Sequence, residues 1–156
     1  MVSSTLCFLR KDGHLLLGMK KRDFGKGKWN GIGGKVEGDE GSTTAAVREL
    51  KEEIGVDCQE GNLKQVATLE FRSENKELEW DVDVFFVTTW SGEPAESDEI
   101  IPQWFDESKL PFDDMWPDDR LWFPCLLSGK VIVGKFTLDA KGKEILSHEI
   151  AETVSE

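Results

Sequence analysis

Three closely spaced glutamates could bind a divalent cation. Glu49, Glu52 and Glu53 stand at positions i, i+3 and i+4, which share one face of an α-helix. Like charges at this spacing destabilise an isolated helix by about 0.2–0.5 kcal/mol per pair, and a hard cation with oxygen ligands would remove that repulsion. An acidic face that is simply solvated is the alternative, and the carboxylates alone leave both interpretations open.

The residues around these glutamates predict a tight loop followed by a helix. Three of the four residues 31–34 are glycines, and glycine lets the backbone approach a neighbour closely or adopt a positive φ. Ser42 and Thr43 are candidate N-caps. Gly55 follows the acidic segment, where a glycine often ends a helix. We therefore expect a helix over residues 43–54 that carries the glutamates.

This segment resembles the signature of the Nudix hydrolases. The residues that carry the resemblance are Gly34, Glu40, Arg48-Glu49-Leu50, Glu52-Glu53 and Gly55-Val56, which match the Nudix box at its specified positions. Nudix proteins hydrolyse a nucleoside diphosphate linked to another group, usually with Mg²⁺. The resemblance therefore implies an α/β/α sandwich with a central mixed sheet, and Mg²⁺ as the cofactor.

The resemblance also assigns roles to the box residues. Cleaving a phosphoanhydride requires charge neutralisation on phosphoryl oxygens and an activated water. By similarity, Glu52 and Glu53 are metal ligands, and Glu49 is a ligand or the group that orients the water. The backbone carbonyl of Gly33 is a further expected ligand.

Two more box residues are expected to support these ligands. Arg48 should pair with a box carboxylate, because its guanidinium offers a rigid fork for bidentate binding. A surface ion pair of little energetic value is the alternative for this residue. Glu40 should brace the loop against the helix.

Length and composition agree with a small enzyme, and the cysteines suit a reducing cytoplasm. The chain has 156 residues with nine Phe and six Trp, and we expect residues 1–156 to form a single Nudix hydrolase domain and to act as a monomer. No apolar run approaches the length of a transmembrane helix, and no signal peptide is evident. The three cysteines, Cys7, Cys58 and Cys125, fit neither a disulfide framework nor a zinc pattern.

The charge distribution favours a small polyphosphate over a nucleic acid. The net charge is −12, and an acidic surface repels a phosphate backbone. However, residues 1–36 carry eight of the 19 Lys/Arg residues and only two of the 31 acidic ones. Lys20 and Lys35 are the strongest candidates for phosphate contact, with ordinary solubilising charge as the alternative.

Alternation of apolar and polar residues predicts a mixed sheet covered by helices. A glycine-rich loop is expected over residues 23–34, and Pro124 is expected to disturb a second helix. The expected strands are residues 5–10, 15–22, 63–72, 78–90, 100–105, 131–138 and 143–148, and the expected helices are residues 43–54 and 118–128.

The segment Trp116-Pro117-Asp118-Asp119 has two interpretations. As a helix start, it places proline and acidic residues in the first turn, next to the positive end of the helix dipole. As a binding site, Trp116 would stack on a base while Asp118 and Asp119 bind its edge. The residues alone do not separate the two.

A second resemblance favours the binding site. The chain is similar, from about residue 15 to residue 127, to the oxidised-purine nucleoside triphosphatases of animals, which are 8-oxo-dGTPases with an activity like that of MutT. The segments that carry this similarity are Leu17-Gly18-Met19-Lys20-Lys21-Arg22, Trp29-Asn30-Gly31, Glu96-Ser97-Asp98-Glu99 and Met115-Trp116-Pro117-Asp118-Asp119.

This resemblance implies a substrate and a set of contacts. The substrates would be 8-oxo-dGTP and 2-hydroxy-dATP, hydrolysed to the monophosphate and pyrophosphate to cleanse the nucleotide pool. Glu99 would be an additional metal-binding or water-orienting acid outside the box. The implied base contacts are a hydrogen bond from Asn30, stacking by Trp116, edge binding by Asp118 and Asp119, and pocket lining by Phe71.

Some residues depart from the family pattern and keep other functions open. The segment 3–10 is not a clear match, Ser73 replaces a pocket aromatic, and Trp80 replaces a smaller apolar side chain. The alternatives are a Nudix hydrolase of a dinucleoside polyphosphate, ADP-ribose or capped RNA, and a non-catalytic nucleotide-binding module. Such modules usually lose the box carboxylates, which this chain retains.

The adjacent acids suggest how one pocket could accept two oxidised purines. In an apolar pocket, desolvation and mutual repulsion should raise one pKa, so that Asp118 and Asp119 titrate as a pair. Moving the shared proton between them would let the pair bind either oxidised guanine or oxidised adenine.

Overall fold

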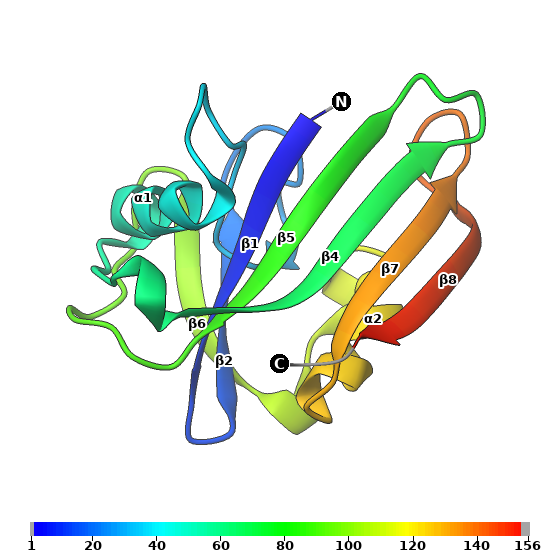
Figure 1. The fold of residues 1–156 in the computed structure, drawn as a ribbon. Coiled ribbons are helices and arrows are strands. Elements are labelled where there is room, and N and C mark those ends of the chain that lie inside the picture. The colour runs from blue at the N-terminus through cyan, green and yellow to red at the C-terminus, as the bar shows by residue number, and fades with distance from the viewer. Residues whose placement is uncertain (1, 154–156) are drawn as a thin grey trace.

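The computed structural model describes residues 2–153, and its strands form one mixed sheet in the order β3-β2-β1-β5-β4-β7-β8, with β6 paired to β2 (Figure 1). The strands are β1 (Val2–Lys11), β2 (His14–Lys20), β3 (Trp29–Asn30), β4 (Leu63–Ser73), β5 (Glu79–Val87), β6 (Ile100–Asp106), β7 (Val131–Leu138) and β8 (Ile145–Thr153). The helices are α1 (Ser42–Ile54), α2 (Asp119–Leu127) and the short 3₁₀ segments η1 (Glu60–Asn62), η2 (Glu107–Lys109) and η3 (Phe112–Asp114).

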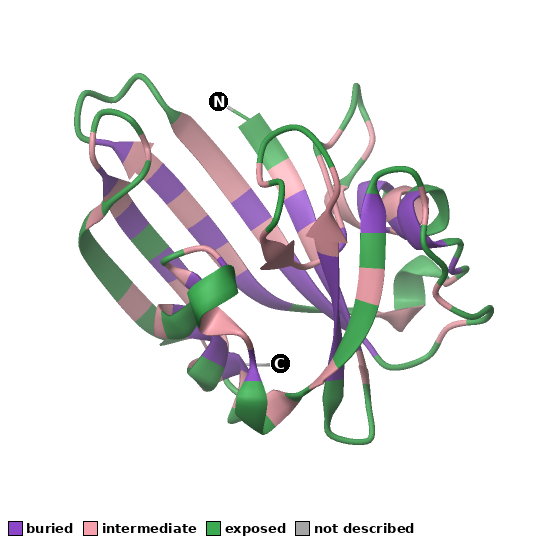
Figure 2. Ribbon diagram, turned by 180° about the vertical axis from the view of Figure 1, so that it is seen from behind, coloured by how far each residue is buried: buried purple, intermediate pink, exposed green. Residues whose placement is uncertain are grey.

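Two apolar cores lie on the two faces of the sheet. Successive strand residues point to opposite faces: Val84 and Phe86 of β5 belong to the core that α2 covers, whereas Phe85 belongs to the core that α1 covers. Figure 2 shows this alternation as bands of buried and partly buried residues along the central strands. The predicted α/β/α sandwich is therefore confirmed.

The element predictions were largely correct, with differences at the ends and in the predicted loop 23–34, where Trp29–Asn30 pairs with β2 as strand β3. β1 begins at Val2 rather than at residue 5, and β8 extends to Thr153 rather than ending at residue 148. Pairing with a neighbouring strand stabilises these polar ends, which alternation does not reveal. The predicted helix stop is confirmed, because Gly55 adopts φ 72° and its N–H caps α1. No helix within residues 2–153 has the length and apolar character needed to cross a membrane.

The predicted N-caps of α1 are wrong. Gly41 is the N-cap, and it provides no side-chain capping bond. Ser42 Oγ instead donates to Asp83 Oδ2 at 2.6 Å, and Thr43 Oγ1 donates to Glu60 Oε1 at 2.5 Å. These hydroxyls tie the start of the helix to β5 and η1, so tertiary partners compete with the local cap.

Four rings stack across adjacent strands on the face that α2 covers. Trp80, Phe71, Phe136 and His148 occupy paired positions on β5, β4, β7 and β8. Their centroids are 5.2, 5.1 and 6.2 Å apart in that order, and the interplanar angles are 17° or less. This aromatic ladder joins the strands side chain to side chain in addition to their backbone pairing.

Candidate active site

A cavity of about 300 Å³ lies on the face of the sheet that carries the aromatic ladder. The loop between β2 and β3 and the segment that leads into α2 form two of its walls. Its floor is apolar and is formed by Leu69, Phe71, Trp80, Val82 and Leu138. One end is formed by Gly33, Gly34 and Glu53, and another part by Asn30, Trp116, Asp118 and Asp119. The structure therefore brings residues of the acidic helix and of the predicted base site into one cavity.

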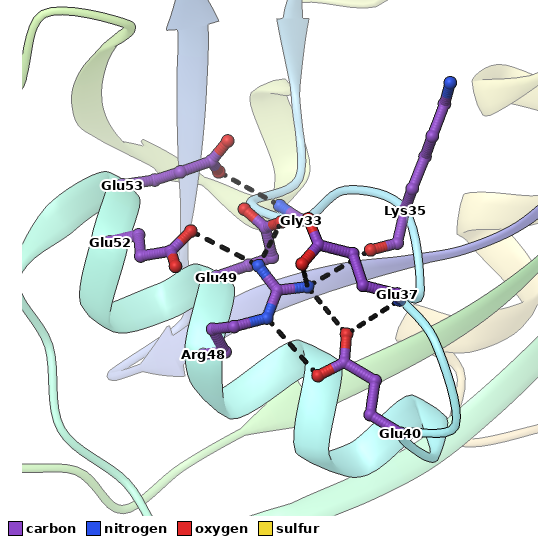
Figure 3. A network of polar contacts seen from close by, with 8 residues as sticks. All are labelled: Gly33, Lys35, Glu37, Glu40, Arg48, Glu49, Glu52 and Glu53. Carbon is purple, nitrogen blue, oxygen red and sulfur yellow. Dashed lines mark hydrogen bonds and ion pairs between the residues drawn. The ribbon is translucent and has the colours of Figure 1, made fainter.

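Arg48 is the centre of a polar network on α1 (Figure 3). Its Nη1 donates to Glu49 Oε1 at 3.0 Å and to Glu52 Oε2 at 3.2 Å. Its Nη2 donates to Glu40 Oε1 at 2.7 Å and to the Lys35 carbonyl at 3.2 Å. The expected pairing of Arg48 with box carboxylates and the bracing by Glu40 are both present. Lys35 does not line the cavity, and its side chain extends away from the network.

Glu53 faces the cavity from α1 and is only 8% exposed. Its Oε2 accepts a hydrogen bond from the Gly33 backbone N–H at 3.2 Å. Burial, and then the neighbouring Glu49, raise the pKa of Glu53 to about 8, while Lys20 opposes this shift. Lys20 lines the same cavity, so a cation and a proton-binding carboxyl lie at this end.

The glycines before α1 are needed for close packing. A Cβ on Gly33 would lie 1.9 Å from the Thr5 carbonyl oxygen, and one on Gly34 would lie 2.6 Å from Glu49 Oε1. Only glycine allows this approach. The loop backbone is therefore held directly against the box carboxylates, as the glycine-rich sequence predicted.

The donor set suits a hard divalent cation. Within residues 2–153, no group of three acidic, His or Cys side chains is gathered closely enough to hold an ion, and Glu49 and Glu52 both accept hydrogen bonds from Arg48. The available donors are nevertheless carboxylate and backbone carbonyl oxygens, which Mg²⁺ prefers. Burial raises the pKa of both Glu49 and Glu53, and a nearby cation would offset that cost.

Glu99 lies near this end of the cavity but does not line it. Its carboxylate is within 3.5 Å of Arg22 Nη2 and is about half exposed. It is close enough to Glu53 to raise the pKa of that carboxyl. Its placement is compatible with the predicted role as an acid outside the box.

Asp118 and Asp119 line the cavity at the start of α2. Asp118 is the N-cap of α2 but makes no capping bond; its Oδ2 accepts from Trp122 Nε1 at 2.8 Å. Asp119 Oδ2 accepts from the Trp116 backbone N–H at 2.9 Å. Asp119 lies in the first turn of α2, as the helix-start interpretation expects, but these bonds use only one oxygen of each carboxyl, so the other oxygen can bind a ligand.

Burial gives the two carboxyls unusual titration behaviour. Desolvation raises the pKa of Asp118, and desolvation together with the charge of Asp118 raises the pKa of Asp119 well above its usual value. Lys28 opposes the shift of Asp119. Two such close acids titrate as a unit, so the pair retains a proton to higher pH than an exposed aspartate.

Trp116 presents its ring in the cavity among residues of the glycine-rich loop. Phe24 stacks on it with centroids 5.0 Å apart, and Lys28 Nζ lies 5.4 Å from its ring centroid. Asn30 Oδ1 accepts from the Gly31 N–H at 2.8 Å, and the Asn30 amide nitrogen, which has no acceptor among the described residues, can donate to a ligand.

Several cavity residues were not predicted from the sequence. The most informative is Thr5, which is 1% exposed and lines the cavity. Its Oγ1 has no hydrogen-bond partner among the described residues. Buried hydroxyls are normally paired, and a threonine among apolar strand residues was the available signal. Phe24, Lys28 and Lys143 are further lining residues that the sequence did not single out.

The departures from the family pattern have different structural outcomes. Trp80 lines the cavity and stacks on Phe71, so it changes the shape of the floor. Ser73 does not line the cavity: its hydroxyl donates to Asn75 Oδ1 at 2.6 Å and accepts from the Leu78 N–H at 2.9 Å. Ser73 therefore stabilises the β4–β5 hairpin.

Comparisons with known proteins agree with the geometry. The NUDIX domain family model matches residues 2–126. The "Oxidized purine nucleoside triphosphate hydrolase" of Danio rerio is 45% identical over 148 residues, which cover 95% of this chain and 93% of that protein. The protein of the same name from Mus musculus is 41% identical over 151 residues, covering 97% and 95%.

A solved structure supports the fold. The crystal structure of a MutT protein from Bacillus halodurans superposes with a TM-score of 0.83 and covers 96% of this chain and 97% of that chain. Its sequence identity is 24%, so this similarity concerns the fold alone.

Proposed function

The chain belongs to the NUDIX family, and on that premise we propose that it hydrolyses oxidised purine nucleoside triphosphates, such as 8-oxo-dGTP and 2-hydroxy-dATP, to the monophosphate and pyrophosphate. One observation carries the proposal. The box residue Glu53 and the paired acids Asp118 and Asp119 line the same cavity. A single nucleotide can therefore place its phosphates near Glu53 and its base near Asp118 and Asp119.

The family typically uses a divalent metal, and we propose Mg²⁺ here. Its ligands would be Glu49, Glu52, Glu53 and the Gly33 carbonyl, with Glu99 as an additional ligand or water-orienting acid. Bound there, the ion supplies positive charge that neutralises phosphoryl oxygens. Each of the acids Glu49, Glu53 and Glu99 is a candidate for accepting the proton of the attacking water.

Other residues of the chain position the phosphates and the acids. Lys20 lines the cavity near Glu53 and would bind a phosphate oxygen. Arg48 holds Glu49 and Glu52 on one side of α1, so it keeps the carboxylates oriented without touching the substrate.

The base site combines stacking with a movable proton. Trp116 and Phe71 would contact the faces of the base, and Asn30 would donate from its free amide nitrogen. A proton shared by Asp118 and Asp119 lets the pair donate to one atom and accept from another. Exchanging the two roles would accommodate oxidised guanine or oxidised adenine.

The acidic surface bears on the class of substrate. A net charge of −12 favours a free nucleotide held partly by a metal over a nucleic acid. We propose that the chain acts as a single-domain monomer in the cytoplasm, where damaged nucleotides would otherwise enter DNA synthesis.

The proposal predicts a preference for oxidised bases. With Mg²⁺ and low micromolar nucleotide, kcat/KM measured by pyrophosphate release should be about tenfold or more higher for 8-oxo-dGTP or 2-hydroxy-dATP than for dGTP or dATP, or roughly 1.4 kcal/mol in transition-state binding. Negligible or equal rates on all four would contradict it. Substrates would then be sought among dinucleoside polyphosphates and ADP-ribose, and a chain with no turnover would be a binding module.

Thr5 offers a separate prediction. Valine has the same shape but no hydroxyl, so Thr5→Val should remove an unpaired buried polar group and stabilise the free protein by about 1 kcal/mol. The same change should raise KM by several-fold if the substrate pairs with this hydroxyl. Thermal unfolding and steady-state kinetics measure the two effects.

Thr68→Val is the matched control, because Thr68 is also on a strand of this sheet but accepts a hydrogen bond from Gln65. It should lose stability and leave KM unchanged. A Thr5→Val protein that is less stable, with an unchanged KM, would show that the hydroxyl has no ligand-binding role.

A further inference from the structure

Part of the cavity wall comes from the end of the chain that the family model does not match. The match ends at residue 126, yet the hairpin that joins β7 to β8 also lines the cavity. Its contributing residues are Leu138, Gly142, Lys143 and Ile145. This hairpin is therefore a part of the cavity wall that lies outside the matched NUDIX domain.

Hydrogen bonds fix the shape of the hairpin tip. The Lys143 N–H donates to Asp139 Oδ1 at 2.7 Å, and the Gly142 N–H donates to the Asp139 carbonyl at 2.9 Å. A Cβ on Gly142, where φ is +73°, would lie 3.1 Å from Leu78 Cδ1 and 3.8 Å from Trp80 Cη2. The tip therefore packs against the β4–β5 hairpin and the edge of the aromatic floor.

Lys143 brings an uncommitted charge to this wall. No Asp or Glu of residues 2–153 lies within ion-pair distance of its ammonium group. An ammonium group has three hydrogen-bond donors and no acceptor. Its complement in a ligand is therefore an oxygen or another acceptor.

The position of Lys143 in the cavity indicates which edge of the base would lie next to it. The β7–β8 hairpin follows the end of β7, whereas α2 precedes its beginning (Figure 1). Asp118 and Asp119, which are proposed to bind the Watson–Crick edge, belong to the wall at the start of α2. The opposite, imidazole edge of the purine would face the hairpin.

We propose that Lys143 is a specificity-determining residue that donates a hydrogen bond to the oxygen added at C8 of an oxidised guanine. The inference rests on the proposed function. An unmodified purine has only hydrogen at C8, so Lys143 would distinguish damaged from undamaged nucleotide at the edge that the paired acids do not reach.

The test compares Lys143→Met with Lys141→Met. Methionine keeps an unbranched apolar stem and removes the charge, and Lys141 lies on the same tip but does not line the cavity. For 8-oxo-dGTP, Lys143→Met should raise KM about tenfold, the size expected for a lost hydrogen bond to a charged group. The kcat and the KM for dGTP should stay within about twofold of wild type, and Lys143→Arg should restore most of the affinity.

The outcomes separate this inference from the proposed function. A wild-type protein without preference for oxidised purines would overturn both. A wild-type protein that prefers 8-oxo-dGTP, with Lys143→Met indistinguishable from Lys141→Met, would overturn this inference alone. An equal rise in KM for 8-oxo-dGTP and dGTP would also overturn it, because Lys143 would then bind a group that the two nucleotides share.

Discussion

Replacing Glu53 with glutamine is expected to lower kcat by about 10²–10⁴-fold. Glu53 is the box carboxylate that faces the cavity, and burial raises its pKa to about 8. Glutamine preserves the size of the side chain and can still accept from the Gly33 N–H. The glutamine amide is neutral, so it cannot bind a cation through a negative charge. It also cannot act as the base that accepts a proton from water. Pyrophosphate release with 8-oxo-dGTP measures the loss.

Nucleotide binding should survive this change, because the base site lies elsewhere in the cavity. Titration calorimetry of the Glu53→Gln protein with 8-oxo-dGTP should therefore detect binding without turnover. Glu74→Gln, on the exposed β4–β5 hairpin, is the control and should match wild type. Near wild-type turnover in Glu53→Gln would exclude this residue from the chemistry, and loss of binding would assign it to substrate affinity.

Replacing Asp119 with asparagine is expected to lower kcat/KM for oxidised purines by about 10–10²-fold. Asparagine can still accept from the Trp116 N–H, as Asp119 does, so the local fold should be retained. It cannot exchange a proton with Asp118. The relative rates for 8-oxo-dGTP and 2-hydroxy-dATP should therefore change and lose their dependence on pH between about 6 and 9. Unchanged relative rates over this range would refute proton sharing.

The Asp119→Asn variant should also change how thermal stability depends on pH, and the raised pKa fixes the direction of that change. Asp119 has a raised pKa in the folded protein, so folding favours its protonated form. That contribution is fully present below the pKa of an unfolded aspartate, near 4, and is lost as pH rises through the folded pKa. The Tm of Asp119→Asn should therefore gain on wild type as pH increases. The exposed Asp114→Asn should show no such gain, and a constant Tm difference for Asp119→Asn would contradict the assignment.

Local sequence rules predicted the parts of this molecule that depend on neighbours in the chain. The spacing of Glu49, Glu52 and Glu53 and the glycine at residue 55 were sufficient for α1, because helix faces and helix stops are local features. Alternation was sufficient for most strands. The N-cap was wrong because Ser42 and Thr43 find partners on β5 and η1, which no local rule can anticipate.

The base site depended on the resemblance, and its remaining residues depended on tertiary structure. Trp116, Asp118 and Asp119 lie in one sequence segment that could be compared with a family. Thr5 and Lys143 reach the same cavity from opposite ends of the chain. Thr5 stands out because its hydroxyl is buried without a partner among residues 2–153, and Lys143 because a hairpin tip packs beside Trp80.

The aromatic ladder supports one side of the cavity more firmly than the opposite side. Trp80 and Phe71 are held by stacked rings and by strand pairing across β5, β4, β7 and β8, so the floor cannot shift without shearing the sheet. The opposing loop contains positive φ angles at Asp23, Gly25 and Gly27 and carries Phe24, which is 81% exposed. We therefore expect differently shaped bases to be accommodated mainly on the side of this loop, while the stacked rings keep the floor of the cavity in place.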